Sequence, residues 1–116
     1  SGSGFLVMPE DGPAADGVDV VRAGRGGVDL AAALTEIGRW PDAPRFVQAE
    51  GGPTINGALL DAGCVDELNL SIAPVLVGGR GTRLARDADE VRQAMALVHT
   101  VVDDDGYLFT RWVRTT

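Results

Sequence analysis

The sequence predicts an α/β domain: a mostly parallel mixed sheet in three layers, with helices on both faces and an antiparallel hairpin at the end. Strand-like and helix-like segments alternate along the first part of the chain, an order that favours parallel strands with helices packed on them. The last part holds two strand-like segments joined by residues 103–106, Asp-Asp-Asp-Gly, a strong hairpin turn. Such a hairpin adds an antiparallel edge, which is common in mixed sheets.

The composition is that of one compact domain. The chain has 116 residues, 45% of them hydrophobic, so it can bury a core but is too short for two domains. The net charge of −7 argues against general binding to nucleic acids or anionic membranes, which need a basic surface. A single cysteine, Cys64, excludes an intrachain disulfide and a cysteine-based zinc site and fits a cytoplasmic location. No apolar run approaches the roughly 20 residues of a membrane span.

The first elements are two short strands and a helix. An apolar strand is expected over Phe5–Met8, and the valines of residues 18–21 form a second strand. Asp29 is a good N-cap for a helix over Leu30–Ile37, which is apolar on one face. Gly38 suits the C-terminal end of that helix.

A buried strand, a glycine turn and a second helix are expected over residues 46–60. Phe46 and Val47 suit the strand, and Pro53 suits the first helical position. Gly51 and Gly52 allow a sharp turn and leave room for a ligand. The free N–H groups of the helix start would form an anion site that typically holds phosphate. From spacing alone, a turn that merely needs glycine explains the pattern equally well.

Three further strands follow the second helix. Leucine and isoleucine alternate with polar residues over residues 68–72, which predicts a strand with one buried face. Residues 74–77 are expected to extend this strand. Residues 97–102 and 107–113 are the two arms of the closing hairpin. The polar segment 80–89 carries no clear pattern.

Several motifs together resemble a known enzyme family. They are Glu50-Gly51-Gly52-Pro53-Thr54, Gly63-x-x-Asp66-Glu67-Leu68, Ile72-Ala73-Pro74-Val75-Leu76-x-Gly78-Gly79 and the closing Asp105-Gly106-Tyr107-Leu108-x-Thr110-Arg111. With them the chain resembles the reductase domain of the bifunctional riboflavin-biosynthesis deaminase-reductase, which has a dihydrofolate-reductase-like fold. The closing motif is similar to the last hairpin of single-domain actinobacterial-type relatives.

The resemblance implies that this chain is the second half of such a domain. The family's first strand, its Ser-x-Asp-Gly-type segment and the following helix, which supply much of the substrate pocket, have no counterpart here. We therefore expect residues 5–116 to be the C-terminal part of the reductase domain and residues 1–4 to be a scar or a loop remnant. The other half would be present but not included in these residues, cleaved off, or held by a second chain. This chain alone would be inactive.

The function that the resemblance implies is hydride transfer from NADPH to 5-amino-6-(5-phosphoribosylamino)uracil or a similar phosphoribosyl-pyrimidine, which opens the ribose to a ribityl chain. Glu50 matches a family position that touches the substrate, whereas no residue is identified as catalytic. The family's cofactor-phosphate turn corresponds to Gly51, Gly52, Pro53, Thr54 and Ile55. Two alternatives stay open: a dihydrofolate-type reductase relative, and a non-catalytic half-domain that binds nucleotides or serves assembly.

The remaining polar and aromatic side chains have plainer interpretations. Asp66 and Glu67 are expected to orient the start of the next strand or to bind an interface arginine rather than to act as a catalytic pair. His99 has no partner at metal-ligand spacing, so no metal site is predicted. Trp40 and Trp112 are expected in the core or in an interface.

Three arginines and one strand pair leave further alternatives. Arg80, Arg83 and Arg86 could meet the 2′-phosphate of the cofactor, because arginine forks suit phosphate, although a solvated loop is the simpler interpretation. The family dimerises through its C-terminal sheet region. The resemblance therefore implies a homodimer, with a surface supplied by the apolar strands of residues 68–72 and 109–112.

Overall fold

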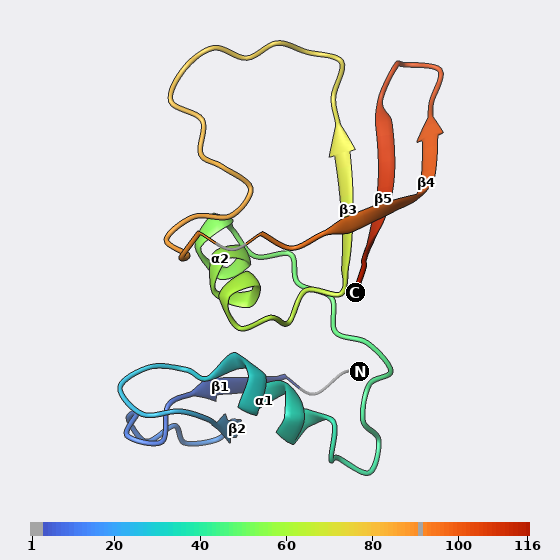
Figure 1. Cartoon of the computed structure of the whole chain (residues 1–116). Coiled ribbons are helices and arrows are strands. Elements are labelled where there is room, and N and C mark those ends of the chain that lie inside the picture. The colour runs from blue at the N-terminus through green and yellow to red at the C-terminus, as the bar shows by residue number, and fades with distance from the viewer. Residues whose placement is uncertain (1–3, 91) are drawn as a thin grey trace. The chain divides into compact units, whose positions relative to one another are not determined.

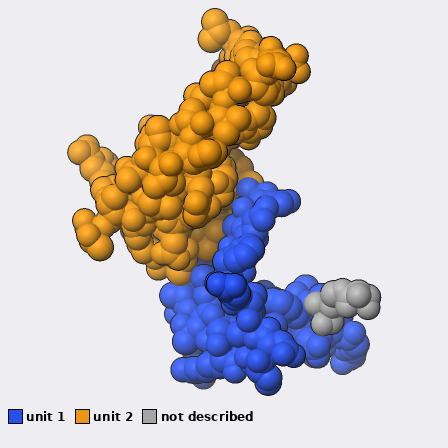
Figure 2. All heavy atoms as spheres, turned by 90° about the vertical axis from the view of Figure 1, so that its right-hand side faces the viewer, with its two compact units in different colours: residues 1–51 blue, residues 52–116 orange. Residues whose placement is uncertain are grey.

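The structure is a computed structural model, in which residues 4–90 and 92–116 are described (Figure 1). It divides into two compact units, Ser1–Gly51 and Gly52–Thr116, which are described separately (Figure 2). The mixed α/β class predicted from the sequence is confirmed. The elements are β1 (Phe5–Met8), β2 (Asp19–Arg22), α1 (Leu30–Ile37), α2 (Pro53–Asp61), β3 (Glu67–Ile72), β4 (Met95–Val102) and β5 (Leu108–Arg114).

The first unit is a parallel strand pair with one helix. Strands β1 and β2 pair in parallel, with Phe5 opposite Asp19 and Met8 opposite Arg22. The loop between them contains no helix. The Arg22 guanidinium stabilises this loop through hydrogen bonds to its backbone carbonyls. Its Nη1 donates to the carbonyls of Pro9 and Gly12, each at 3.1 Å, and its Nη2 donates to that of Pro13 at 2.9 Å. One side chain thus closes a connection that usually requires a helix.

Helix α1 covers this pair with a small apolar core. The core consists of Val21 and Ala23 from β2 and its end, and of Ala33 and Ile37 from α1. Trp40 packs against this cluster, and its ring meets that of Phe5 edge to face at a centroid distance of 4.8 Å. The expected core position of Trp40 is therefore confirmed.

The bounds of α1 agree with the sequence prediction at both ends. Asp29 is the N-cap, and its carboxylate accepts the Ala32 N–H at 2.9 Å. Gly38 is the C-cap, and its N–H donates to the carbonyl of Leu34. Capping is a local interaction, so these bounds could be predicted without knowledge of the tertiary structure.

The second unit contains a three-stranded antiparallel sheet in the order β3-β5-β4. Leu68 lies opposite Trp112, and Leu70 opposite Thr110. The Thr110 side chain is buried; its hydroxyl donates to the Leu70 carbonyl at 3.0 Å and accepts from Trp112 Nε1 at 2.9 Å. The first bond joins the middle strand to β3, and the second orients the Thr110 hydroxyl within β5.

The closing hairpin forms where the sequence predicts it. Strands β4 and β5 are joined by the turn of residues 103–106, and Gly106 has a φ of +85°, a conformation that favours glycine. The Asp103 carboxylate accepts the N–H of Asp105 at 3.0 Å and of Tyr107 at 2.8 Å. The positive φ of Gly106 and the hydrogen bonds of Asp103 thus stabilise the turn at the position that the pairing of β4 with β5 requires.

The strand predicted at Phe46 is wrong. Residues 46–50 belong to no strand, and Phe46 and Val47 are 79% and 58% exposed. A central strand of a parallel sheet is stabilised by neighbours on both sides, and no described strand pairs with this segment. The predicted extension of β3 is also wrong: β3 ends at Ile72, and Leu76 is fully exposed.

The expected single, mostly parallel sheet is therefore not observed. The described residues form two sheets, and two of the three strand pairings are antiparallel. The helices α1 and α2 have 8 and 9 residues, and neither has the length and apolar character needed to cross a membrane.

Candidate functional site

The start of α2 is the centre of the candidate site. Gly52 is the N-cap, with φ −71° and ψ −177°, and Pro53 is the first helical residue, as predicted. The Asn56 N–H donates to the Gly52 carbonyl at 3.1 Å. The N–H groups of Thr54 and Ile55 belong to the first helical turn, where the helix itself supplies no acceptor. The helix dipole adds partial positive charge at this end.

Gly52 does not need to be glycine for the fold of the described residues. Its φ lies in a region that any residue adopts, and a Cβ placed there would meet nothing within 4 Å. The interpretation that this turn merely requires glycine is therefore not supported at this position. An open approach to the helix start remains the physical advantage of a residue without a side chain.

A segment of the long connection between β3 and β4 lies against α2. We call residues 84–89 the strap; in Figure 1 it belongs to the orange part of the chain beside α2. The Arg86 N–H donates to the Pro53 carbonyl at 3.0 Å. Asn56 Nδ2 donates to the Leu84 carbonyl at 2.9 Å. The strap thus contacts the first turn of the helix through both backbone and side chain.

The strap is fixed at the other end of the helix as well. The Asp89 N–H donates to the Asp61 carboxylate at 3.1 Å. In between, Gly57 is buried, and a Cβ on it would lie 2.0 Å from the carbonyl oxygen of Arg86. This glycine permits the backbone of the strap to pass directly over the helix.

A polar cluster forms where the strap meets the predicted cofactor turn. Arg86 Nε donates to Thr54 Oγ1 at 3.1 Å, and the Thr54 hydroxyl donates to Asp87 Oδ2 at 3.4 Å. Arg86 Nε also lies 3.2 Å from Asp87 Oδ2. Of the three arginines considered from the sequence, Arg86 therefore reaches the turn, whereas Arg80 and Arg83 are exposed in the connection.

Glu50 lies at the end of the other unit. Its side chain is exposed, and its Oε1 accepts from Gln48 Nε2 at 2.8 Å. The boundary between the units falls between Gly51 and Gly52. The structure thus assigns the sequence-predicted residues to two parts: Glu50 and Gly51 to the first unit, Gly52 and the helix start to the second.

The carboxylates Asp66 and Glu67 bind arginines of the neighbouring strand β5. Glu67 Oε2 lies 2.7 Å from Arg111 Nη2, and Asp66 Oδ1 lies 3.6 Å from Arg114 Nη1. The hydrogen bond from Arg111, followed by that from Asn69, holds the pKa of Glu67 below its ordinary value, and the same contact raises the pKa of Arg111. Glu67 is thus a charged structural partner, in line with the plainer interpretation.

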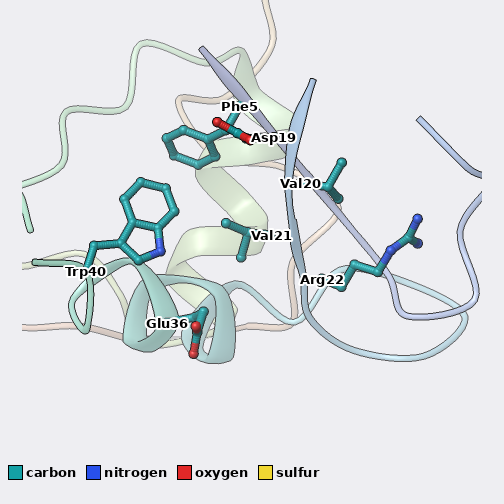
Figure 3. A pocket seen from close by; sticks show the side chains of 7 residues that line it. All are labelled: Phe5, Asp19, Val20, Val21, Arg22, Glu36 and Trp40. Carbon is teal, nitrogen blue, oxygen red and sulfur yellow. The ribbon is translucent and has the colours of Figure 1, made fainter. Parts of the chain in front are cut away.

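Two hollows of about 210 Å³ each occur in the described residues, and neither contains a predicted site residue. The first lies beside β2, with the Phe5 and Trp40 rings among its walls (Figure 3). The second lies on the β3-β5-β4 sheet, around His99, Phe109 and Arg111. Both are smaller than the roughly 300 Å³ at which ligand pockets usually begin.

Sequence reasoning missed the strap and its contact with Thr54. One signal was present: glycine inside a helix costs about 1 kcal/mol relative to alanine, so Gly57 indicated a close approach of another backbone. Its partner segment could not be identified in this way, because residues 84–89 carry no periodic pattern.

The fold places the chain in a class of known proteins. A crystal structure of a pyrimidine reductase-like protein from Corynebacterium diphtheriae matches 86% of this chain with a TM-score of 0.71 at 24% sequence identity. The chain thus has the mixed α/β fold of pyrimidine reductase-like proteins. The sequence profile of the RibD C-terminal domain matches residues 10–109. The chain belongs to the RibD C-terminal domain family, and the resemblance inferred from its motifs is confirmed.

Two curated relatives are reductases or riboflavin-biosynthesis proteins by name. The 2,5-diamino-6-ribosylamino-4(3H)-pyrimidinone 5′-phosphate reductase of Methanothermobacter thermautotrophicus is 39% identical over 47% of this chain and 29% of its own length. The riboflavin biosynthesis protein RibD of Escherichia coli is 43% identical over 47% of this chain and 14% of its own. The matches thus span less than a third of these relatives, and 40% of the solved C. diphtheriae chain.

Proposed function

We propose that this chain is part of an NADPH-dependent reductase of the riboflavin pathway, which reduces 5-amino-6-(5-phosphoribosylamino)uracil or a close analogue to the ribitylamino product. Membership of the RibD C-terminal domain family and the reductase among its relatives support the reaction class. The single observation that supports the cofactor site most directly is the open helix start at Gly52, next to the Thr54 hydroxyl and Arg86.

The residues at this helix start fit a dinucleotide phosphate. The N–H groups of Thr54 and Ile55 and the Thr54 hydroxyl would donate to the pyrophosphate, and Gly52 leaves space for it. Gly51 is proposed to belong to the same phosphate turn, as the family resemblance implies. Pro53 sets the first helical turn and removes an N–H that would have no partner there. NADPH, when bound, supplies the hydride; the protein positions the cofactor and binds its charge.

Glu50 is proposed to face the substrate. As an exposed carboxylate directly before the glycine turn, it would accept hydrogen bonds from the ribose hydroxyls or the pyrimidine N–H groups. Its role is to orient the substrate beside the cofactor rather than to transfer a proton.

The complete domain is proposed to contain further strands that pair with the exposed apolar segments of this chain. Phe46 is 79% exposed, and Val75, Leu76 and Val77 are 65%, 105% and 86% exposed. Side chains of this kind suit a sheet interior. Pairing with strands from the rest of the polypeptide, or from a second chain, would create the three-layer, mostly parallel arrangement of the dihydrofolate-reductase-like fold. Residues 5–116 are then its C-terminal part, inactive alone.

We further propose that the complete protein is a cytoplasmic homodimer that uses the β3-β5-β4 sheet. Val101 and Phe109 lie opposite each other on β4 and β5, so they share one face of this sheet, and they are 45% and 41% exposed. This is an apolar surface that a second copy would cover. Sedimentation of the complete protein tests this proposal: a monomer at micromolar concentration would contradict it.

NADPH titration tests the cofactor site. Quenching of tryptophan fluorescence in the complete domain should saturate with NADPH. Thr54→Asp should abolish this binding, since it places a carboxylate against the phosphates, whereas Thr54→Ser keeps the hydroxyl and should keep the binding. Saturable binding that is unaffected by Thr54→Asp would mean that the phosphate turn lies elsewhere.

A second candidate is a non-catalytic nucleotide-binding module. The observation that favours it is that neither of the two hollows described above, each of about 210 Å³, contains a predicted site residue. The two functions are distinguished by NADPH oxidation with the phosphoribosyl-pyrimidine, with dihydrofolate as the alternative substrate. Binding without oxidation of either would support the module.

A further inference from the structure

We propose that Asp87 is an internal anion that occupies the phosphate position at the start of α2 and is displaced when the cofactor binds. Its Oδ2 lies 3.4 Å from Thr54 Oγ1 and 3.2 Å from Arg86 Nε. These are the hydroxyl and the guanidinium at the proposed phosphate turn. The inference rests on the proposed cofactor site and adds to it a regulatory contact within the chain.

The backbone of the strap holds Asp87 in this position. Asp87 has a φ of +58° and is the one non-glycine residue with a positive φ in the described part of the chain. Aspartate tolerates this conformation better than most residues. On one side Arg86 is bound to the Pro53 carbonyl, and on the other Asp89 is bound to Asp61. The carboxylate thus meets the helix start because the strap directs it there.

The contact can open without movement of the strap. The Asp87 side chain is 66% exposed and that of Arg86 is 53% exposed, so a rotamer change takes the carboxylate into solvent. Arg86 and Thr54 then become available to a phosphate. A group with more negative charge than one carboxylate binds this cation and helix end more strongly, so the exchange favours phosphates over weaker anions.

The contact of Asp87 with Arg86 and Thr54 weakens cofactor binding, because the cofactor must displace the carboxylate. Displacement of Asp87 breaks its exposed ion pair with Arg86, and such a pair contributes at most about 1 kcal/mol, which corresponds to about a fivefold change in Kd. Neutralisation of Asp87 should therefore tighten NADPH binding about fivefold.

The test compares Asp87→Asn with Asp89→Asn in the complete domain. Asparagine keeps the shape of the side chain and tolerates the positive φ, so Asp87→Asn removes only the charge. Asp89 is on the same strap, and its contact to Asp61 uses the backbone N–H, which the second variant retains. NADPH and inorganic pyrophosphate are titrated against each variant by calorimetry at low and high salt.

The proposal expects about fivefold tighter binding of both probes in Asp87→Asn, a gain that shrinks in high salt, and no change in Asp89→Asn. An unchanged Kd in Asp87→Asn, or an equal gain in both variants, would overturn it. If the unmodified protein binds NADPH and Thr54→Asp does not, such a result refutes only the role of Asp87. If the unmodified protein binds neither probe, the proposed cofactor site fails together with this inference.

Discussion

Replacement of Gly57 by alanine tests the contact between α2 and the strap. A Cβ at this position would lie 2.0 Å from the carbonyl oxygen of Arg86 and 3.0 Å from its carbonyl carbon. Atoms do not approach so closely, so the strap must move by roughly 1 Å or detach from the helix. The two bonds at risk are Arg86 N–H to the Pro53 carbonyl and Asn56 Nδ2 to the Leu84 carbonyl.

The expected change in the free energy of unfolding is the sum of a stabilising and a destabilising contribution. Alanine favours the helix over glycine by about 1 kcal/mol. Overpacking costs about 1–3 kcal/mol, and loss of two hydrogen bonds costs about 1 kcal/mol each. The net cost is about 0–2 kcal/mol if the strap is pushed aside and about 1 kcal/mol if it is released. Gly57→Ala should therefore destabilise the second unit by about 1 kcal/mol, the opposite sign from helix propensity alone.

Two measurements check this expectation. Urea denaturation gives the change in the free energy of unfolding, and hydrogen exchange should show lost protection of the Arg86 amide. Gly81→Ala is the matched control: it lies in the same connection, and a Cβ there would meet nothing within 4 Å, so its effect should stay within about 0.5 kcal/mol. A stabilised Gly57→Ala variant with a protected Arg86 amide would refute the argument.

Three further predictions concern single residues. Glu67→Gln should lower stability at pH 7 but not in acid. The pKa of Glu67 is lowered on folding, so its contribution is present above the ordinary value of 4.5 and is lost as the pH falls through the folded value; a pH-independent difference in melting temperature would contradict this. Asp29→Ala should cost about 1 kcal/mol of stability by removing the N-cap of α1, measured by denaturation, with Asp29→Asn close to neutral. Gly106→Ala should destabilise the hairpin by about 1 kcal/mol, because alanine at a φ of +85° is strained, and an unchanged melting temperature would contradict this.

Local signals in the sequence were sufficient for the helices and the hairpin. Asp29 and Gly38 bound α1, Pro53 begins α2, and Asp103 with Gly106 forms the turn between β4 and β5. Each of these features depends on interactions within a few residues. Their positions therefore do not require knowledge of distant parts of the chain.

Features that depend on distant partners were not predictable in the same way. The apolar residues at Phe46 and at Val75 read as strands, but a strand needs a neighbour, and no described segment pairs with them. The strap has no pattern of its own, and its course over α2 depends on the gap left by Gly57. The helix start at Gly52 and Pro53 was predicted correctly. Arg86 was one of three candidate arginines in the sequence, and the structure was needed to show which of them contacts Thr54.

The exposed apolar run of Val75, Leu76 and Val77 affects how readily this polypeptide aggregates or is degraded in a cell. Exposed apolar segments of this kind promote aggregation, and chaperones and proteases recognise them. Without strands to cover this run, the chain is a substrate for quality control. Protein segments that pack on this run would therefore also protect the chain from aggregation and degradation.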